Sequence, residues 1–212
     1  MSQLAIWTGN QLPPVNLAML ALAAPYTAHS SAPADQLASH DHGRHTDAQC
    51  STVQGMRDWW GVNDRNETLE TLDQLLAGMH APLYERMAET PAIAERWAPV
   101  LHGPDARLLP FPAPRSIVAW DIARLANMVR NSFSIGRLSE GESWAYLEAA
   151  LLRARGAHLD WLEYGQAFLL GRAFWLAYNT DYGQIAGSFA EHGPVIRQLN
   201  SDPVSPWLHT RL

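Results

Sequence analysis

The sequence contains no lysine, and all 15 of its basic residues are arginine. A lysine Schiff base, the attachment of pyridoxal phosphate, a Walker-type phosphate loop and the strand lysine of kinases all require a lysine side chain. Its absence therefore excludes these kinds of site.

Cysteine is scarce as well, and the basic residues are not clustered. The single Cys50 excludes an intrachain disulfide and a cysteine-based zinc finger. The formal net charge is −6, and the arginines are spread along the chain from Arg44 onward. Phosphate binding needs a clustered basic surface, so we do not expect nucleic acid as a partner.

Long apolar runs are also missing. The N-terminal run over residues 17–24 is shorter than the roughly 20 residues that cross a bilayer, and no basic residue precedes it as in a signal peptide. We therefore expect a cytoplasmic protein without a membrane partner.

What the sequence does contain is apolar and aromatic residues at helical spacing. Apolar residues make up 47% of the chain and include nine tryptophans, enough to bury a substantial core. Apolar positions recur every three or four residues over most of the chain, and no segment alternates as a strand does. The glycine-containing residues 181–193 are the exception, and they are predicted to be a loop with a short helix. The sequence predicts an all-α fold, a single domain over residues 1–212 with about eight to ten helices.

The most apolar of these predicted helices covers about residues 160–178. Asp160 is its predicted N-cap, with Glu163 three residues later as in a capping box. The second half of this helix is apolar on all sides, which is typical of a buried central helix. Arg172 is the one charge in that apolar part, and a buried guanidinium needs a carboxylate partner.

The predicted helix that begins near residue 116 carries a candidate partner. Asp121 lies on the apolar face of this helix, where a carboxylate is costly unless it is paired. We predict that Asp121 is within hydrogen-bond reach of Arg172, with Arg124 and His80 adjoining. Such a group can be structural and fix the register of two helices, or it can line a pocket for an anion. The aromatic core expected around it consists of Trp120, Trp161, Trp175 and Trp207.

Two segments are predicted to be irregular. Residues 29–51 are polar and rich in small side chains, which predicts a mobile loop. This loop carries His40, His42 and His45, whose spacing matches no standard metal site, so a solvated loop is favoured over metal binding. Four prolines predict an extended crossing over residues 102–115, inside the same domain.

Several motifs follow one another in a fixed order along the chain. They are W-G-V at 60–62, G-M-H at 78–80, A-W-D-I-A-R at 119–124, S-E-G-E-S-W at 139–144, W-L-E-Y-G-Q-A-F-L-L-G-R-A-F-W at 161–175 and D-P-V-S-P-W at 202–207. In this combination the chain resembles the bacterial family called domain of unknown function 1266, over about residues 55–207. The resemblance implies a helical fold, and it places His80, Asp121, Arg124 and Arg172 among the family's polar positions. It implies no reaction, because the family's activity is not established.

Two hypotheses for the function remain. A small acidic helical protein with no catalytic residue assigned and no cofactor motif suits a protein-binding module. One example is an immunity protein that neutralises a bacterial toxin, where an acidic surface complements a basic partner. The alternative is a hydrolase or transferase in which His80 acts as a base and the arginines hold a small anion. The sequence favours the protein-binding hypothesis.

Overall fold

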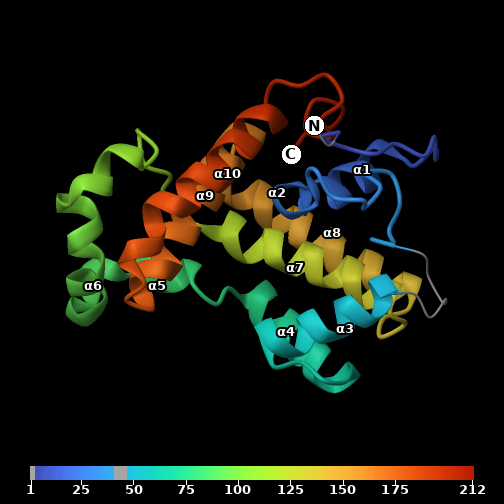
Figure 1. Ribbon diagram of the computed structural model, residues 1–212, viewed down its shortest axis with the longest axis horizontal. Coiled ribbons are helices and arrows are strands. Elements are labelled where there is room, and N and C mark those ends of the chain that lie inside the picture. Colours follow the sequence, from blue (N-terminus) through green and yellow to red (C-terminus); the bar gives the residue numbers. More distant parts are fainter. Residues whose placement is uncertain (1–2, 41–46) are drawn as a thin grey trace.

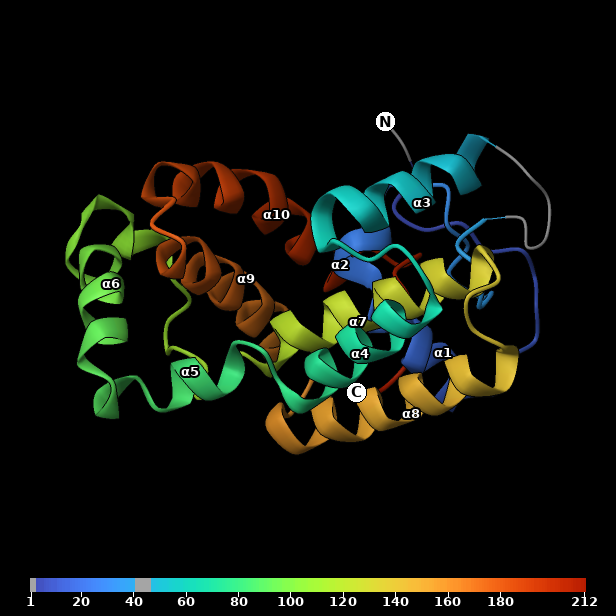
Figure 2. The ribbon, with the colours of Figure 1, turned by 90° about the horizontal axis from the view of Figure 1, so that it is seen from below.

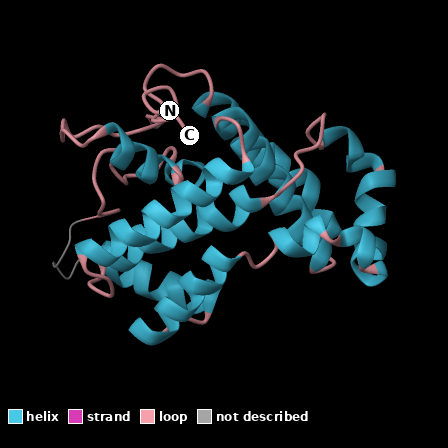
Figure 3. Ribbon diagram, turned by 180° about the vertical axis from the view of Figure 1, so that it is seen from behind, coloured by secondary structure: helices cyan, strands magenta, loops and turns pink. Residues whose placement is uncertain are grey.

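The computed structural model describes residues 3–40 and 47–212, and all regular elements within these ranges are helices (Figure 3). The ten α-helices of the described residues are α1 (Pro14–Ala21), α2 (Ala24–Thr27), α3 (Asp47–Trp60), α4 (Arg65–Ala77), α5 (Ala81–Glu85), α6 (Pro91–His102), α7 (Val118–Ser134), α8 (Glu140–Ala157), α9 (Trp161–Tyr178) and α10 (Ile185–Leu199). Three short 3₁₀ helices accompany them, η1 (Met87–Glu89), η2 (Pro104–Leu108) and η3 (Tyr182–Gln184). The predicted all-α fold is confirmed.

Helices α7 and α9 form the centre of the molecule. The ribbon shows α7 surrounded by α8, α9, α4 and α2, and α9 packs against α7, α10 and α6 (Figures 1 and 2). The predicted central helix is confirmed as α9, whose N-cap Asp160 accepts a hydrogen bond from the backbone of Glu163 at 2.8 Å. Helix α7 shares the central position, although its charged residues made it look amphipathic in the sequence.

A glycine lets α7 and α9 approach closely. A Cβ atom placed on Gly171 would lie 2.4 Å from the Cβ atom of Trp120, closer than two such atoms come in folded proteins. Only glycine therefore fits at this crossing. The crossing places Trp120 of α7 beside Phe168 and Trp175 of α9, with ring centroids 5.5 and 5.9 Å away.

The segment after α10 returns to the start of the chain. Trp207 stacks on Trp161 of α9 with ring centroids 5.3 Å apart, and its Nε1 donates to the carbonyl of Ala21 at 2.9 Å. Trp7 donates to the carbonyl of Val204 at 2.9 Å, so the two terminal segments lie side by side (Figure 1). These aromatic contacts hold both segments to the core.

The described parts of the predicted mobile loop over residues 29–51, namely 29–40 and 47–51, are tied down or helical. Helix α3 begins at Asp47, so the end of this segment is helical. Arg130 of α7 is 1% exposed and donates to four backbone carbonyl groups between residues 33 and 38. Because this anchor comes from a distant helix, the composition of the segment itself gave no sign of it.

The prediction of a loop with a short helix over residues 181–193 is wrong, because η3 leads directly into the long helix α10. Helix α10 continues through Gly193 and Pro194, which have low helix propensity. Packing outweighs that propensity, because the buried side chains of α10 recur every three or four residues. They belong to Ile185, Ser188, His192, Ile196 and Leu199.

The proline-rich segment 102–115 is partly helical. Helix α6 includes His102, and η2 follows directly, so only the stretch between η2 and α7 runs without a helix. One cluster of buried apolar residues includes members of helices on both sides of this connection. None of the helices in the described ranges combines the length and apolarity that a bilayer crossing needs.

Candidate functional site

Asp121 lies in the first turn of α7 and caps a different helix, α5. Its Oδ2 atom accepts hydrogen bonds from the backbone N–H groups of His80 and Ala81, both at 3.0 Å. These groups belong to the start of α5, where N–H groups have no partner within the helix. Asp121 thereby ties α7 to the connection between α4 and α5.

Arg124 neutralises Asp121 from the next turn of α7. Its Nη2 donates to Oδ1 of Asp121 at 2.6 Å, and the two residues are 8% and 1% exposed. Burial raises the pKa of Asp121, but the charge of Arg124 and the backbone N–H groups of His80 and Ala81 lower it further, so this pKa lies below its ordinary value. The carboxylate is ionised, and both of its oxygens have partners.

His80 completes this group, which we call the Asp121 cluster (His80, Asp121 and Arg124). Its Nδ1 lies 2.9 Å from Nη2 of Arg124 and 3.3 Å from Oδ1 of Asp121. A guanidinium only donates, so the shorter contact requires a lone pair on Nδ1 and assigns the proton to Nε2. The Nδ1 lone pair is then directed at Arg124 and not at a substrate, which argues against His80 as a general base.

Arg172 is not part of the Asp121 cluster, so the predicted Asp121–Arg172 pair is wrong. Nε of Arg172 donates instead to Oγ of Ser188 on α10 at 2.7 Å. Within residues 3–40 and 47–212, no carboxylate lies within ion-pair distance of this half-buried guanidinium. The reason is that Arg124, three residues after Asp121 on the same helix, already occupies the carboxylate.

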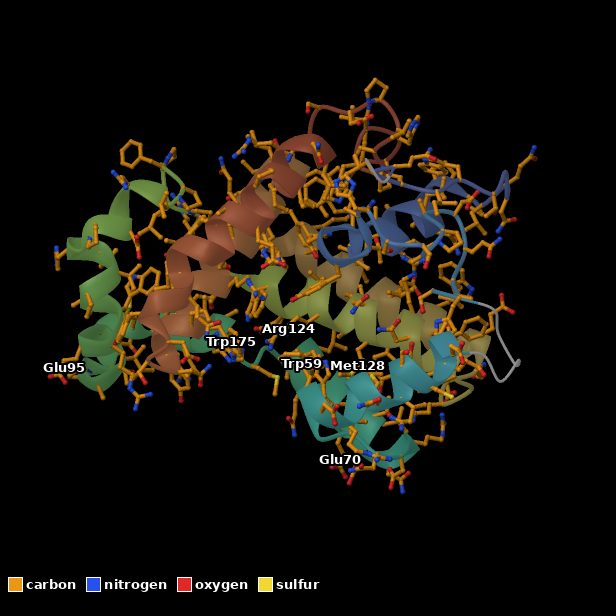
Figure 4. All side chains as sticks on the ribbon, viewed as in Figure 1. Trp59, Glu70, Glu95, Arg124, Met128 and Trp175 are labelled. Carbon is orange, nitrogen blue, oxygen red and sulfur yellow. The ribbon has the colours of Figure 1, made fainter. Side chains whose placement is uncertain are left out.

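The two arginines are nevertheless neighbours, because both lie against the indole ring of Trp120. The Cζ atom of Arg124 is 4.7 Å from the ring centroid, and that of Arg172 is 5.8 Å from it. Figure 4 shows Arg124 and Trp175 near the place where α7 and α9 meet. Nε1 of Trp120 is buried and has no hydrogen-bond acceptor in the described part of the chain. The site therefore holds one neutralised and one unneutralised cation on a shared aromatic ring.

Three of the four predicted core tryptophans are buried. Trp120, Trp161 and Trp207 are 2%, 6% and 2% exposed, whereas Trp175 is half-buried. Trp161 and Trp207 stack on each other at the other end of α9, away from the arginines. Trp60 was not predicted, and its ring lies 5.4 Å from Cζ of Arg124.

Sequence reasoning also missed the contributions of α2 and α10. Tyr26 of α2 packs with its ring centroid 5.5 Å from that of Phe168, and burial raises the pKa of its hydroxyl. Burial, followed by the charge of Arg172, lowers the pKa of His192 on α10. Ser188 and His192 are four residues apart on one face, a signal that the glycines around them concealed.

The histidine segment gives no metal site in the described residues. No group of three or more His, Cys, Asp or Glu side chains there is placed to hold a metal ion. His40 contacts Oγ of Ser39 through Nδ1 at 3.0 Å, while His42 and His45 lie outside the described residues.

A second candidate surface lies on the consecutive helices α3 and α4, at one side of the molecule (Figures 1 and 4). Trp59 in the last turn of α3 is 86% exposed. The exposed acidic side chains of residues 47–77 are those of Asp47, Asp58, Asp64, Glu70 and Asp73. Trp59 is thus a single large aromatic side chain left in solvent, next to the exposed Asp58.

Comparisons with known proteins give a family and no activity. Residues 92–212 match the family model described as "Protein of unknown function (DUF1266)", which includes Asp121, Arg124 and Arg172 but not His80. The chain is 26% identical over 128 residues to the "Uncharacterized protein YbeU" of Escherichia coli (strain K12), which covers 55% of this chain and 54% of the relative. The chain thus spans about half the length of that curated relative, and no solved structure matches. Because the model covers more than half of the chain, this protein belongs to the DUF1266 family, as its motifs indicated.

Proposed function

We propose that this protein is a protein-binding module that docks a basic partner on helices α3 and α4. The observation that carries the proposal is the 86% exposure of Trp59, on a pair of helices with a net negative charge. Tryptophan is enriched among the residues that dominate binding energy at protein interfaces, because it buries a large area at little conformational cost. A tryptophan left in water is the kind of anchor that a partner's apolar pocket would cover.

The net negative charge of helices α3 and α4 favours a basic partner. Residues 47–77 contain six acidic residues and two arginines, so they carry four of the chain's six net negative charges. One of the two arginines, Arg65, is paired with Glu142 of α8 at 2.5 Å. Its charge is therefore not available to neutralise the carboxylates of α3 and α4. Complementary charge speeds association and excludes acidic competitors.

A bacterial toxin is the partner class that we favour, and the protein would then act as its immunity protein. Toxins that act on nucleic acid carry basic surfaces because they must bind phosphate. An acidic module that covers such a surface would block the toxin's access to its substrate.

The binding test compares two exposed aromatic residues. The tagged protein is used to capture a partner from the native host, and affinities are then measured with Trp59→Ala and with the control Phe111→Ala. Phe111 is 95% exposed and lies in the connection between η2 and α7. We expect a basic partner, a loss of about 2 kcal/mol or more for Trp59→Ala, and little change for Phe111→Ala. An acidic partner, or equal effects of the two variants, contradicts the proposal.

The immunity role has a separate test in cells. Deletion should make the host more sensitive to its own kin, and the wild-type gene should restore protection while the Trp59→Ala variant does not. If the captured protein is not toxic when it is expressed alone, the immunity role is wrong, although the docking surface can stand.

A hydrolase or transferase centred on His80 is less supported. The Nδ1 atom of His80 contacts Arg124, and the residue itself is the N-cap of α5. The anion-binding part of that alternative depends on Arg172 alone, and it can be tested without assuming a reaction.

A further inference from the structure

We propose that Arg172 is the anchor of a binding site for a small ligand that carries a carboxylate or phosphate group. This site is separate from the surface of α3 and α4, and it does not depend on the function proposed above. Four helices surround it: α9 carries Arg172, α7 carries Trp120, α10 carries Ser188, and α2 packs against both α7 and α10.

The guanidinium of Arg172 is held in place but not satisfied. Its single hydrogen bond within the described residues uses Nε, which donates to Ser188 at 2.7 Å. The two terminal nitrogens therefore present four N–H donors without a protein acceptor in this part of the chain. Two parallel donors of this kind match the two oxygens of a carboxylate or phosphate. Because Ser188 and Trp120 fix the plane of the group, little conformational freedom is lost on binding.

A buried donor beside the guanidinium also lacks an acceptor. Nε1 of Trp120 is excluded from water and has no partner among the described residues. A buried N–H group without an acceptor costs about 1–3 kcal/mol, so such groups are rare and call for an explanation. An oxyanion on Arg172 would bring acceptor oxygens next to the same indole ring.

The electrostatics of the site favour a negative charge. Of the two nearby carboxylates, Arg124 already neutralises Asp121 at 2.6 Å, and the exposed Glu191 lies 3.5 Å from Nδ1 of His192, where water screens its charge. Within the described ranges nothing neutralises Arg172, and burial together with this charge keeps the pKa of the neighbouring His192 below its ordinary value. The net field of the site is therefore positive, although the protein as a whole is acidic.

The surroundings also indicate the body of the ligand. Trp175 lies three residues after Arg172 on α9, so the two side chains are neighbours on the helix surface. Trp175 is half-buried, and its inner side packs on Trp120. Its accessible part offers a flat apolar surface on which an aromatic ligand can stack. The ligand class is thus a small aromatic carboxylate or phosphate monoester.

The test is calorimetric titration of the full chain with four sodium salts, at constant ionic strength balanced with chloride. The probes are acetate, benzoate, inorganic phosphate and phenyl phosphate, so that carboxylate is distinguished from phosphate and the aromatic body from the anion. We expect benzoate or phenyl phosphate to bind with a Kd of about 1 mM or tighter, and to bind better than the matching probe without a ring.

Two variants of Arg172 separate charge from geometry. Arg172→Gln should weaken binding at least about tenfold, whereas Arg172→Lys should retain part of it, because an ammonium keeps the charge but loses the two-pronged donor. Far-UV circular dichroism and thermal melting establish that each variant is folded.

Arg96 supplies the matched control. It also lies over an aromatic ring, with its Cζ atom 5.3 Å from the centroid of Tyr178, and it donates to a backbone carbonyl at 2.6 Å. Arg96→Gln should leave binding of all four probes unchanged. The proposal is overturned if no probe binds the wild type, if Arg172→Gln binds as tightly as the wild type, or if Arg96→Gln loses as much as Arg172→Gln.

Discussion

Two arginines on neighbouring helices contact the same tryptophan, and they differ in what satisfies them. Arg124 is buried, and its guanidinium contacts the carboxylate of Asp121, the imidazole of His80 and the backbone carbonyl of Trp120. Arg172 is half-buried and has one hydroxyl. A buried charge with a complete set of partners holds helices together, whereas an incompletely satisfied charge near the surface can still bind something. We therefore assign the Asp121 cluster a structural role and Arg172 a binding role.

The largest effect is expected from Asp121→Ala. This change leaves Arg124 unpaired in the core and removes the acceptor at the start of α5, so the free energy of unfolding should fall by about 3–5 kcal/mol. Urea denaturation measures it. The matched control is Asp160→Ala, which removes a helix cap at an exposed residue and should cost about 1 kcal/mol. Equal losses for the two variants would mean that the Asp121 cluster contributes no more than a surface cap.

The sequence located the unusual charges but paired them incorrectly. Asp121 was recognisable because it interrupts an apolar stripe, and Arg172 because it interrupts an apolar helix. Their pairing seemed to follow, yet a carboxylate at i and an arginine at i+3 satisfy each other locally, as Asp121 and Arg124 do. The acceptor role of His80 depends on the turn between α4 and α5, whose direction no periodicity specifies.

The fold was predictable wherever helical spacing and capping agreed. Helices α4, α8 and α9 have both, and they occur close to their predicted positions, whereas α7 was predictable from its spacing alone because it has no side-chain cap. Helix α10 contains glycine and proline and is stabilised by its packing on α9, which the local sequence does not record. Ser188 belongs to that helix, so the residue that orients Arg172 could not be found from the sequence.

The next largest effect is a dependence on pH that arises outside both arginine groups, at His158. Burial lowers the pKa of His158 to about 4, and its Nε2 accepts a hydrogen bond from the backbone N–H of Ala119 in α7 at 3.2 Å. The unfolded chain binds a proton near pH 6.5 whereas the folded chain does not, so stability is lost as the pH falls from about 6.5 towards 4. The full loss from this group is about 3 kcal/mol.

His158→Gln isolates this contribution, because an amide oxygen can still accept from Ala119 but does not titrate. Unfolding free energies are compared at about pH 7.5 and about pH 4.5. The wild type should lose more stability over this range than the variant does. Parallel curves for the two proteins would contradict the assignment and leave the carboxylates as the source of acid sensitivity.

A smaller effect is expected where α9 crosses α7. Gly171→Ala places a methyl group against Trp120 and should cost about 1–3 kcal/mol through overpacking. Gly156→Ala in α8 is the control, because a Cβ atom there meets nothing and helix propensity should make the change neutral or stabilising. Because both arginines lie against the ring of Trp120, Gly171→Ala should also weaken the binding of benzoate or phenyl phosphate. If stability falls and binding does not, Arg172 is positioned by Ser188 alone.

The smallest effect on stability is expected from Arg172→Gln, and this variant distinguishes a binding role of Arg172 from the structural role of Arg124. The side chain is half-buried and makes one hydrogen bond to Ser188, so its removal should change the free energy of unfolding by less than about 1 kcal/mol. A decrease in positive charge near His192 should also raise the pKa of that imidazole, which a histidine-detected NMR titration can follow. A loss comparable to that of Asp121→Ala would make Arg172 a structural residue like Arg124. A small loss of stability together with loss of anion binding is the combination that only a ligand-binding arginine produces.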